Sequence, residues 1–166
     1  MTDHFERFSM YGISIDYPDN ARVEFNSKGR RETGDVAFHL PESIRIFLSW
    51  GELEKVSKRF NSVQEHAEYS LDAMKKGKNV ANFEPASSDS MTVNTHKAAL
   101  NMIKFDEMVA SIPFAAKKPL KRSAYSLHVH CDKSNRYFVL YTMSPNDDQR
   151  KYDKILTTMA ESFKCH

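Results

Sequence analysis

Residues 96–107 place apolar side chains on both faces of one predicted strand, and no other pattern in the chain constrains the fold as strongly. Two interleaved sets carry the pattern: Ala98, Leu100 and Met102 on one face, and Ala99, Ile103 and Phe105 on the other. Successive side chains of a strand point to opposite faces, so a strand that is apolar on both faces must be covered on both. We therefore predict a sheet with helices on each side, one from each half of the chain.

Two segments have the periodicity of such helices. Ser62 and Glu65 form a capping box at the start of the first, and Gly77 can end it. Its apolar residues recur at helical spacing: Val63, Ala67, Leu71 and Met74. The second is predicted to begin in residues 144–147, with Ser144 as cap and Pro145 at the first helical position, and to end at Phe163. Its apolar stripe is Tyr152, Ile155, Leu156, Met159 and Phe163.

Shorter runs of alternating apolar residues predict further strands. These runs are 13–17, 22–25, 35–40, 44–50, 126–131 and 136–143. Tight turns join most of them, which favours antiparallel pairing. Residues 83–90 are interpreted as a polar link, and residues 109–122 as a long connection. The predicted fold is an α+β single domain spanning residues 1–166, an α/β/α sandwich around a mainly antiparallel sheet.

Composition narrows the classes of function. The chain has 166 residues and a formal net charge of +2, without the concentrated basic excess of a general nucleic-acid binder. No stretch is apolar for long enough to span a bilayer, and the N-terminus does not resemble a signal peptide. We expect a cytoplasmic protein. Cys131 and Cys165 do not indicate a disulfide scaffold; a bond between them would be a tether, and Cys131 is expected to act as a small buried hydrophobe.

Two segments resemble a known family. Residues 11–18 read YGISIDYP, similar to its opening strand, which ends in a Tyr-Pro pair. Residues 137–142 followed by Ser144 and Pro145 resemble its final strand and helix. This is the PsbP-like family, together with its structural relative, the nuclear import factor that binds the Ran GTPase. The resemblance implies an α/β/α sandwich and a family that mostly binds partners. It implies no shared reaction, and no partner-binding residue transfers from it.

His128 and His130 are the strongest candidate metal ligands. A His-x-His pair on a strand puts both imidazoles on one face, where a third ligand can complete a divalent-metal site. His96 is the preferred third ligand and His39 the alternative. The competing interpretation is a polar strand face without a metal. Cys131 alternates to the opposite face and should not act with this pair.

Residues 109–122 supply the candidate contact surface. It combines apolar and basic side chains: Ile112, Phe114, Lys117, Lys118, Lys121 and Arg122. Apolar groups beside positive charge on a long loop are typical of a docking site for an acidic partner or a membrane surface. The alternative is that Ile112 and Phe114 fold back onto the core as a lid.

The sequence lacks a phosphate-binding glycine loop and a nucleophile elbow. A non-catalytic binding protein is therefore the leading hypothesis, with another protein as partner and a homodimer as one form of that partner. No cofactor is expected under this hypothesis. A domain that binds a small ligand or a divalent metal through His128 and His130 is second, and an enzyme without a recognisable motif is third.

Overall fold

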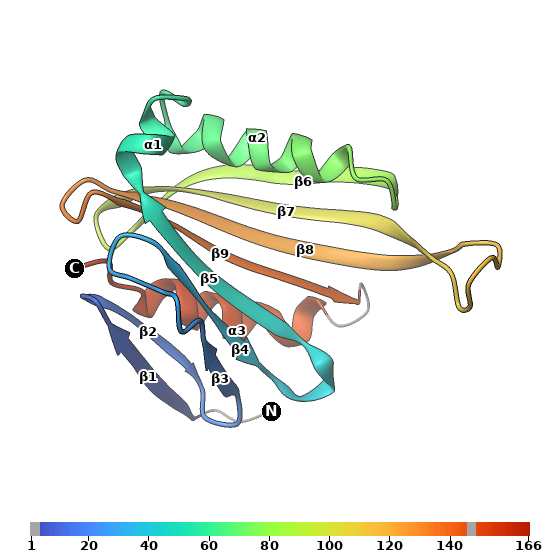
Figure 1. Ribbon diagram of the computed structural model, residues 1–166, viewed down its shortest axis with the longest axis horizontal. Helices are drawn as coiled ribbons and strands as arrows, with labels where there is room; N and C mark the ends of the chain where they lie inside the picture. The colour runs from blue at the N-terminus through green and yellow to red at the C-terminus, as the bar shows by residue number, and fades with distance from the viewer. Residues whose placement is uncertain (1–3, 146–148) are drawn as a thin grey trace.

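The computed structural model describes residues 4–145 and 149–166 (Figure 1). Within these described residues the strands are β1 Phe5–Met10, β2 Ile13–Pro18, β3 Arg22–Phe25, β4 Gly34–His39, β5 Arg45–Glu52, β6 Val80–Val93, β7 His96–Val109, β8 Lys118–Cys131 and β9 Arg136–Pro145. The helices are α1 Leu53–Ser57, α2 Val63–Lys75 and α3 Gln149–Ser162, with a short 3₁₀ turn at Pro41–Ser43.

Seven strands form one sheet in the order β3-β4-β5-β9-β8-β7-β6, and every neighbouring pair is antiparallel. The first two strands pair with each other in a separate hairpin. The antiparallel expectation is therefore confirmed. The sequence left the strand order open, and the structure places β9 between β5 and β8, so the two halves of the chain meet inside the sheet.

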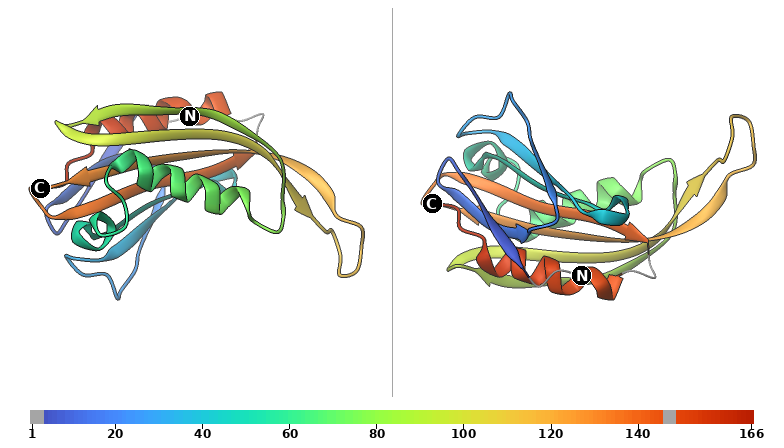
Figure 2. Two further views of the ribbon diagram at one scale, coloured as in Figure 1. Left: turned by 90° about the horizontal axis from the view of Figure 1, so that it is seen from above. Right: turned by 90° about the horizontal axis from the view of Figure 1, so that it is seen from below.

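One helix covers each face of this sheet, as the doubly apolar strand requires. In Figure 2, α2 lies over β6, β7 and β8 on one side, and α3 lies on the other side with the β1–β2 hairpin beside it. Both helices come from the predicted halves of the chain. The α+β sandwich with a mainly antiparallel sheet is confirmed.

The start of α2 follows its sequence signal. Ser62 accepts a hydrogen bond from the Glu65 amide at 3.1 Å, which satisfies a free donor of the first turn. The Glu65 carboxylate in turn accepts from the Asn61 amide at 2.8 Å, one residue earlier than the simplest capping box. Two hydrogen bonds from backbone amides to side chains, one to Ser62 and one to Glu65, therefore stabilise the start of the helix.

The predicted start of the last helix needs correction. Ser144 and Pro145 end strand β9, where they pair with Ser123 and Arg122 of β8. Proline is tolerated at a strand end because a missing amide there removes little of the hydrogen-bonded ladder. Asn146 and Asp147 lie outside the described residues, and the helix itself runs from Gln149 to Ser162.

The main core lies between the sheet and α3. Among its fully buried members are Ile13, Ile15, Phe38, Phe138 and Met159. Trp50 is also buried there, and its indole nitrogen donates to the Arg30 carbonyl at 2.9 Å.

Strand β6 was not predicted from the sequence, and β7 and β8 are longer than predicted. Residues 83–90, interpreted as a polar link, belong to β6 and pair with β7. β6 is the edge strand of the sheet, and an edge tolerates polar side chains because it is packed less completely. β7 and β8 also continue past the helices as a projecting two-stranded arm, visible at one end of Figure 1. Within the described part of the chain, no helix has the length and apolarity needed to cross a membrane.

Candidate functional site

The histidine pair lies on the α2 face of the sheet, as its spacing predicted. His128 is 1% exposed and His130 is partly exposed, while Leu127 and Val129 point into the core under α3. Strand β8 places the two imidazoles on one side because they are two residues apart.

A third histidine joins them from α2. His66 Nδ1 lies 3.2 Å from His130 Nε2, and the His66 and His128 ring centroids are 4.9 Å apart. Two hydroxyls fix the His128 ring, since Ser126 Oγ lies 3.2 Å from its Nδ1 and Ser70 Oγ lies 3.2 Å from its Nε2. Sequence reasoning missed His66. The signal was its position beside buried Ala67, with Ser70 one turn later on the same helix face.

Burial keeps these imidazoles neutral at neutral pH. Desolvation, reinforced by the neighbouring histidines, lowers the pKa of His128 to about 3. The same cause lowers the pKa of His66 to about 4, and burial also lowers the pKa of His130. A neutral ring presents one donor and one acceptor, so this cluster can bind polar groups without carrying charge.

The expected third metal ligands do not reach this cluster, and that part of the prediction was wrong. His96 lies on the other face of the sheet, where its Nε2 is 3.9 Å from Cys131 Sγ. His39, at the end of β4, pairs with Glu24 at 2.9 Å. Whether either residue shares a sheet face with His128 could not be predicted from the sequence, because that relation depends on strand order and register.

A cavity of about 430 Å³ adjoins His128 on this face. It lies between α2 and the sheet, and its walls combine aromatic, aliphatic and polar groups, among them Phe47, Val139, Tyr141, His66 and Asn101. Asn101 is 2% exposed and donates to the Ala67 carbonyl at 3.0 Å, while its Oδ1 has no hydrogen-bond partner among the described atoms. An apolar hollow with a few fixed polar groups is suited to a small ligand.

A second cavity, of about 480 Å³, lies on the α3 face beside the sheet edge. Its walls are mostly apolar and include Met91, Val93, Leu100, Met102 and Tyr125. The outer turns of α3 close it with Asp153, Thr157 and Glu161. None of the predicted partner-binding or metal-ligating residues lines it.

The predicted contact segment has a different form from the expected loop. Residues 118–122 are part of β8, and β7 runs to Val109, so the connection shortens to residues 110–117. Ile112 is 66% exposed and Phe114 is fully exposed. Both therefore point into solvent, and the alternative of a lid folded over the core is excluded.

The basic residues of this segment make different contacts and have different roles. Arg122 forms an ion pair with Glu107 at 2.8 Å across the β7–β8 ladder, which makes it a part of the arm's own structure. Lys117 Nζ donates to Asn79 Oδ1 at 2.7 Å and ties the arm to the loop after α2. Lys118 and Lys121 are exposed and lie three positions apart on a strand, so they point to opposite faces of the arm.

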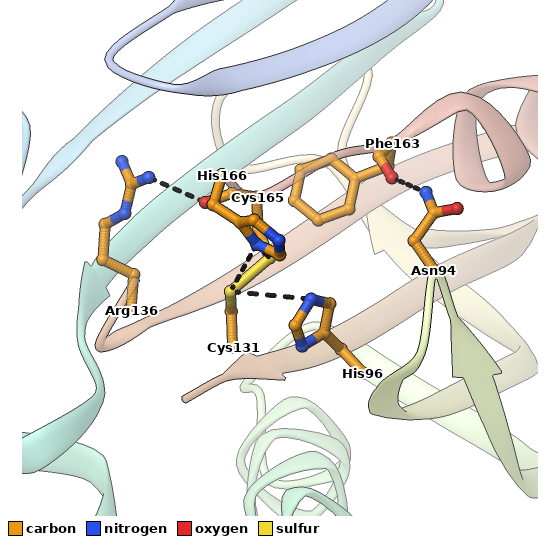
Figure 3. The surroundings of a disulfide bond; sticks show 7 residues. All are labelled: Asn94, His96, Cys131, Arg136, Phe163, Cys165 and His166. Carbon is orange, nitrogen blue, oxygen red and sulfur yellow. Dashed lines mark hydrogen bonds between the residues drawn. A yellow bond between two sulfur atoms is a disulfide. The ribbon is translucent and has the colours of Figure 1, made fainter. Parts of the chain in front are cut away.

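A third constellation lies at the other end of β7 and β8 (Figure 3). Cys131 and Cys165 form a disulfide with Cα atoms 6.6 Å apart, so Cys131 is cross-linked and does not act merely as a small hydrophobe. The imidazoles of His96 and His166 lie beside the sulfurs, with their ring centroids 5.2 Å apart. Within residues 4–145 and 149–166, this is the group of metal-ligating side chains whose ligand atoms all lie within 4.8 Å of one another.

The order of strands in the sheet and the helix on each of its faces can be compared with known structures. The fold is shared with PsbP and Mog1 structures. Cyanobacterial PsbP from Synechocystis sp. PCC 6803 superposes with a TM-score of 0.56 at 11% identity, over 98% of this chain and 92% of that one. The Ran-binding protein Mog1p of Saccharomyces cerevisiae superposes with a TM-score of 0.58 at 10% identity, over 98% of this chain and 95% of that one.

A third similar structure is PA94 from Pseudomonas aeruginosa, a protein of unknown function described as a putative regulator. Its TM-score is 0.53 at 7% identity, over 96% of this chain and 95% of that one. No protein-family model matches the sequence, and no curated protein matches it. The PsbP-like resemblance seen in the sequence is thus confirmed at the level of fold, and sites must be argued from this chain's own residues.

Proposed function

We propose that this protein is a non-catalytic binding module whose β7–β8 arm docks onto an acidic surface of a partner protein. The observation that carries the proposal is the fully exposed Phe114 at the tip of a projecting arm. Large apolar side chains on the same arm accompany it: Val109, Ile112 and Leu120. Contiguous exposed apolar groups are typical of interaction surfaces, and aromatic residues are frequent anchors at their centres.

The backbone at the tip supports the same interpretation. Phe114 has a φ of 68°, in the left-handed region, which costs a non-glycine residue about 1–2 kcal/mol. A bulky residue held there, with its ring in solvent, gains nothing from packing within this chain. Backbone strain of this kind concentrates where a side chain serves binding.

Charge indicates the chemistry of the partner. The hydrogen bond from Lys117 to Asn79 brings the arm beside the end of α2, which carries its own lysines: Lys75, Lys76 and Lys78. Two basic clusters that are separate in the sequence therefore meet at one end of the molecule. Arg122 neutralises Glu107, and the excess positive charge of the lysines is complementary to an acidic surface on a partner. Mog1p is itself a Ran-binding protein, which supports the class of function and identifies no partner here.

The test is capture of protein from an extract of the native host by the tagged chain. Changing Phe114→Asp together with Lys118→Glu and Lys121→Glu should weaken binding of the captured partner at least about tenfold, as loss of an interface anchor does. Binding should also weaken with added salt. The matched control places the same changes elsewhere, at exposed Tyr69, Lys28 and Lys97, and should bind normally.

Two outcomes would contradict the proposal. Undiminished capture by the arm variant, with an unchanged circular dichroism spectrum, would remove the arm from the interface. Strong binding to anionic phospholipid vesicles without a protein partner would favour a membrane surface. Light scattering of the purified chain separates a homodimer from capture of a different protein.

A small-ligand site beside His128 is the second candidate function. The 430 Å³ cavity and the unpaired Asn101 Oδ1 favour it. A divalent metal is a weaker occupant, because His66, His128 and His130 are not among the described groups whose ligand atoms all lie within 4.8 Å of one another. A ligand screen by thermal shift, with His128→Ala as the variant expected to lose the response, tests this candidate.

A further inference from the structure

We propose that the reduced form of this protein holds one zinc ion between Cys131, Cys165, His96 and His166. The site lies at the end of β7 and β8 opposite the arm, so it is independent of the proposed docking role (Figures 1 and 3). Two cysteine thiolates and two imidazoles form a complete tetrahedral set, the pattern of closed structural zinc sites.

The interatomic distances fit this ion. Zinc bonds of about 2.3 Å to sulfur and 2.0–2.1 Å to nitrogen place neighbouring ligand atoms about 3.3–3.8 Å apart. Cys131 Sγ lies 3.9 Å from His96 Nε2 and 3.7 Å from His166 Nδ1, and Cys165 Sγ lies 3.3 Å from His166 Nδ1. These three distances are close to the required range, and all four ligand atoms lie within 4.8 Å of one another. The two bonded sulfurs must separate before an ion can enter.

The fold holds these four residues in place from three directions. His96 opens β7 and Cys131 ends β8, at the same end of a continuous antiparallel pair. Cys165 and His166 come from the C-terminal tail, which Lys164 fastens to Ser14 by two backbone hydrogen bonds of 3.0 and 2.8 Å.

Two side chains also hold the C-terminal tail, one on each side of Lys164 in the sequence. Arg136 Nη2 donates to the Cys165 carbonyl at 2.9 Å, and Asn94 Nδ2 donates to the Phe163 carbonyl. The site is therefore largely formed before any ion binds, which lowers the entropic cost of binding.

Electrostatics favour the thiolate form. Arg136 is buried beside the Cys131–Cys165 disulfide, and a neighbouring guanidinium stabilises a thiolate relative to a thiol. Two thiolates, two neutral imidazoles and Zn²⁺ sum to zero charge, so the filled site adds no uncompensated charge to the buried end of the core. Cys131 and Cys165 are both almost completely buried, which protects the bound ion from solvent.

The disulfide and the zinc site are alternative states of the same cysteines. A thiol reductant converts the disulfide to two thiols and is itself oxidised to a disulfide, transferring two electrons and two protons. Zn²⁺ then displaces the two thiol protons as it binds. Oxidation reverses the sequence and releases the ion.

The experiment compares the oxidised and reduced full-length chain. Each form is incubated with zinc sulfate, desalted without oxygen, and analysed for metal by mass spectrometry. We expect one zinc per chain in the reduced form and none in the oxidised form. Cobalt(II) in place of zinc should give the thiolate charge-transfer absorption of a tetrahedral site. Reduced protein that retains no zinc, with both thiols open to a thiol reagent, would overturn the proposal.

Substitutions test which residues bind the zinc ion. Cys131→Ser with Cys165→Ser should abolish zinc uptake, and His166→Ala should weaken it at least about tenfold, since loss of even an outer-shell partner costs that much. His166 is exposed at the C-terminus, so its removal leaves the core intact. His130→Ala is the matched control: it lies beside Cys131 on the same strand but on the α2 face. Normal zinc binding by the double cysteine variant, or its loss in His130→Ala, would refute this assignment.

Discussion

Breaking the Cys131–Cys165 bond is expected to lower the free energy of unfolding by about 4 kcal/mol in metal-free buffer. The bond closes a segment with a sequence separation of 34, and a bridge of that span restricts the unfolded chain by about this amount. The segment includes β9 and α3, which contribute much of the main core, including Phe138 and Met159. Loss of the bond therefore frees the end of the chain that closes one face of the sheet.

Urea unfolding followed by circular dichroism measures this effect. Cys131→Ala with Cys165→Ala should unfold at lower urea than the oxidised chain, with a similar slope. The reduced chain in a metal chelator should match that variant, since both lack the cross-link. Adding zinc should then restore stability to the reduced chain alone. Equal midpoints for the oxidised chain and the alanine variant would show that the bond adds no stability.

Local patterns in the sequence predicted most of the architecture. The doubly apolar strand at residues 96–107 required cover on both faces, and α2 and α3 supply it. Ser62 begins α2 because a serine followed by a glutamate three residues later satisfies the free amides of a first turn. These features depend on residues close in sequence, so periodicity and capping were enough to find them.

Elements that depend on pairing were harder to predict. Residues 83–90 form part of a strand although most of their side chains are polar, because β7 provides a partner for their backbone. Residues 118–122 are basic and contain Pro119, yet they continue β8 opposite residues 105–109. Such segments take their structure from the neighbouring strand, and the sequence of the segment alone does not reveal that neighbour.

The candidate sites also include residues that local patterns could predict and residues whose positions depend on strand pairing. Alternation along β8 correctly separated His128 and His130 from Cys131, since it needs only the period of a strand. Assigning His96 required knowing that β7 and β8 pair so that residue 98 faces residue 129. His166 was missed because the C-terminal tail had no periodic pattern, and tertiary contacts from Ser14 and Arg136 place it.

Acidification from pH 7 to pH 4 is expected to destabilise the fold through its buried histidines. The pKa of His128 falls from 6.5 to about 3 on folding, chiefly because burial penalises the charged ring. His66 falls from 6.5 to about 4, where burial acts together with the charges of His130 and Arg59. Asp132 acts in the opposite direction on His130 but does not prevent the pKa of that ring from being lowered.

The direction of the effect follows from proton binding. A histidine with a lower pKa in the folded state binds protons more readily when the chain unfolds. Stability is therefore unaffected above about pH 6.5, falls as the pH drops below that value, and levels off below the folded pKa. His128 alone should cost about 3 kcal/mol by pH 4. His66 should add less than its shift implies, because it is partly exposed and solvent screens its charge.

Urea unfolding at intervals between pH 7 and pH 4 measures the loss, and substitution assigns it. His128→Gln removes the titrating ring and keeps a polar side chain beside Ser70, so the variant should lose markedly less stability on acidification than the parent chain. His4→Gln, exposed near the N-terminus, is the control and should follow the parent. Carboxylates contribute equally to all three chains and cancel in the comparison. An identical pH profile for His128→Gln and the parent would show that His128 is not the group responsible.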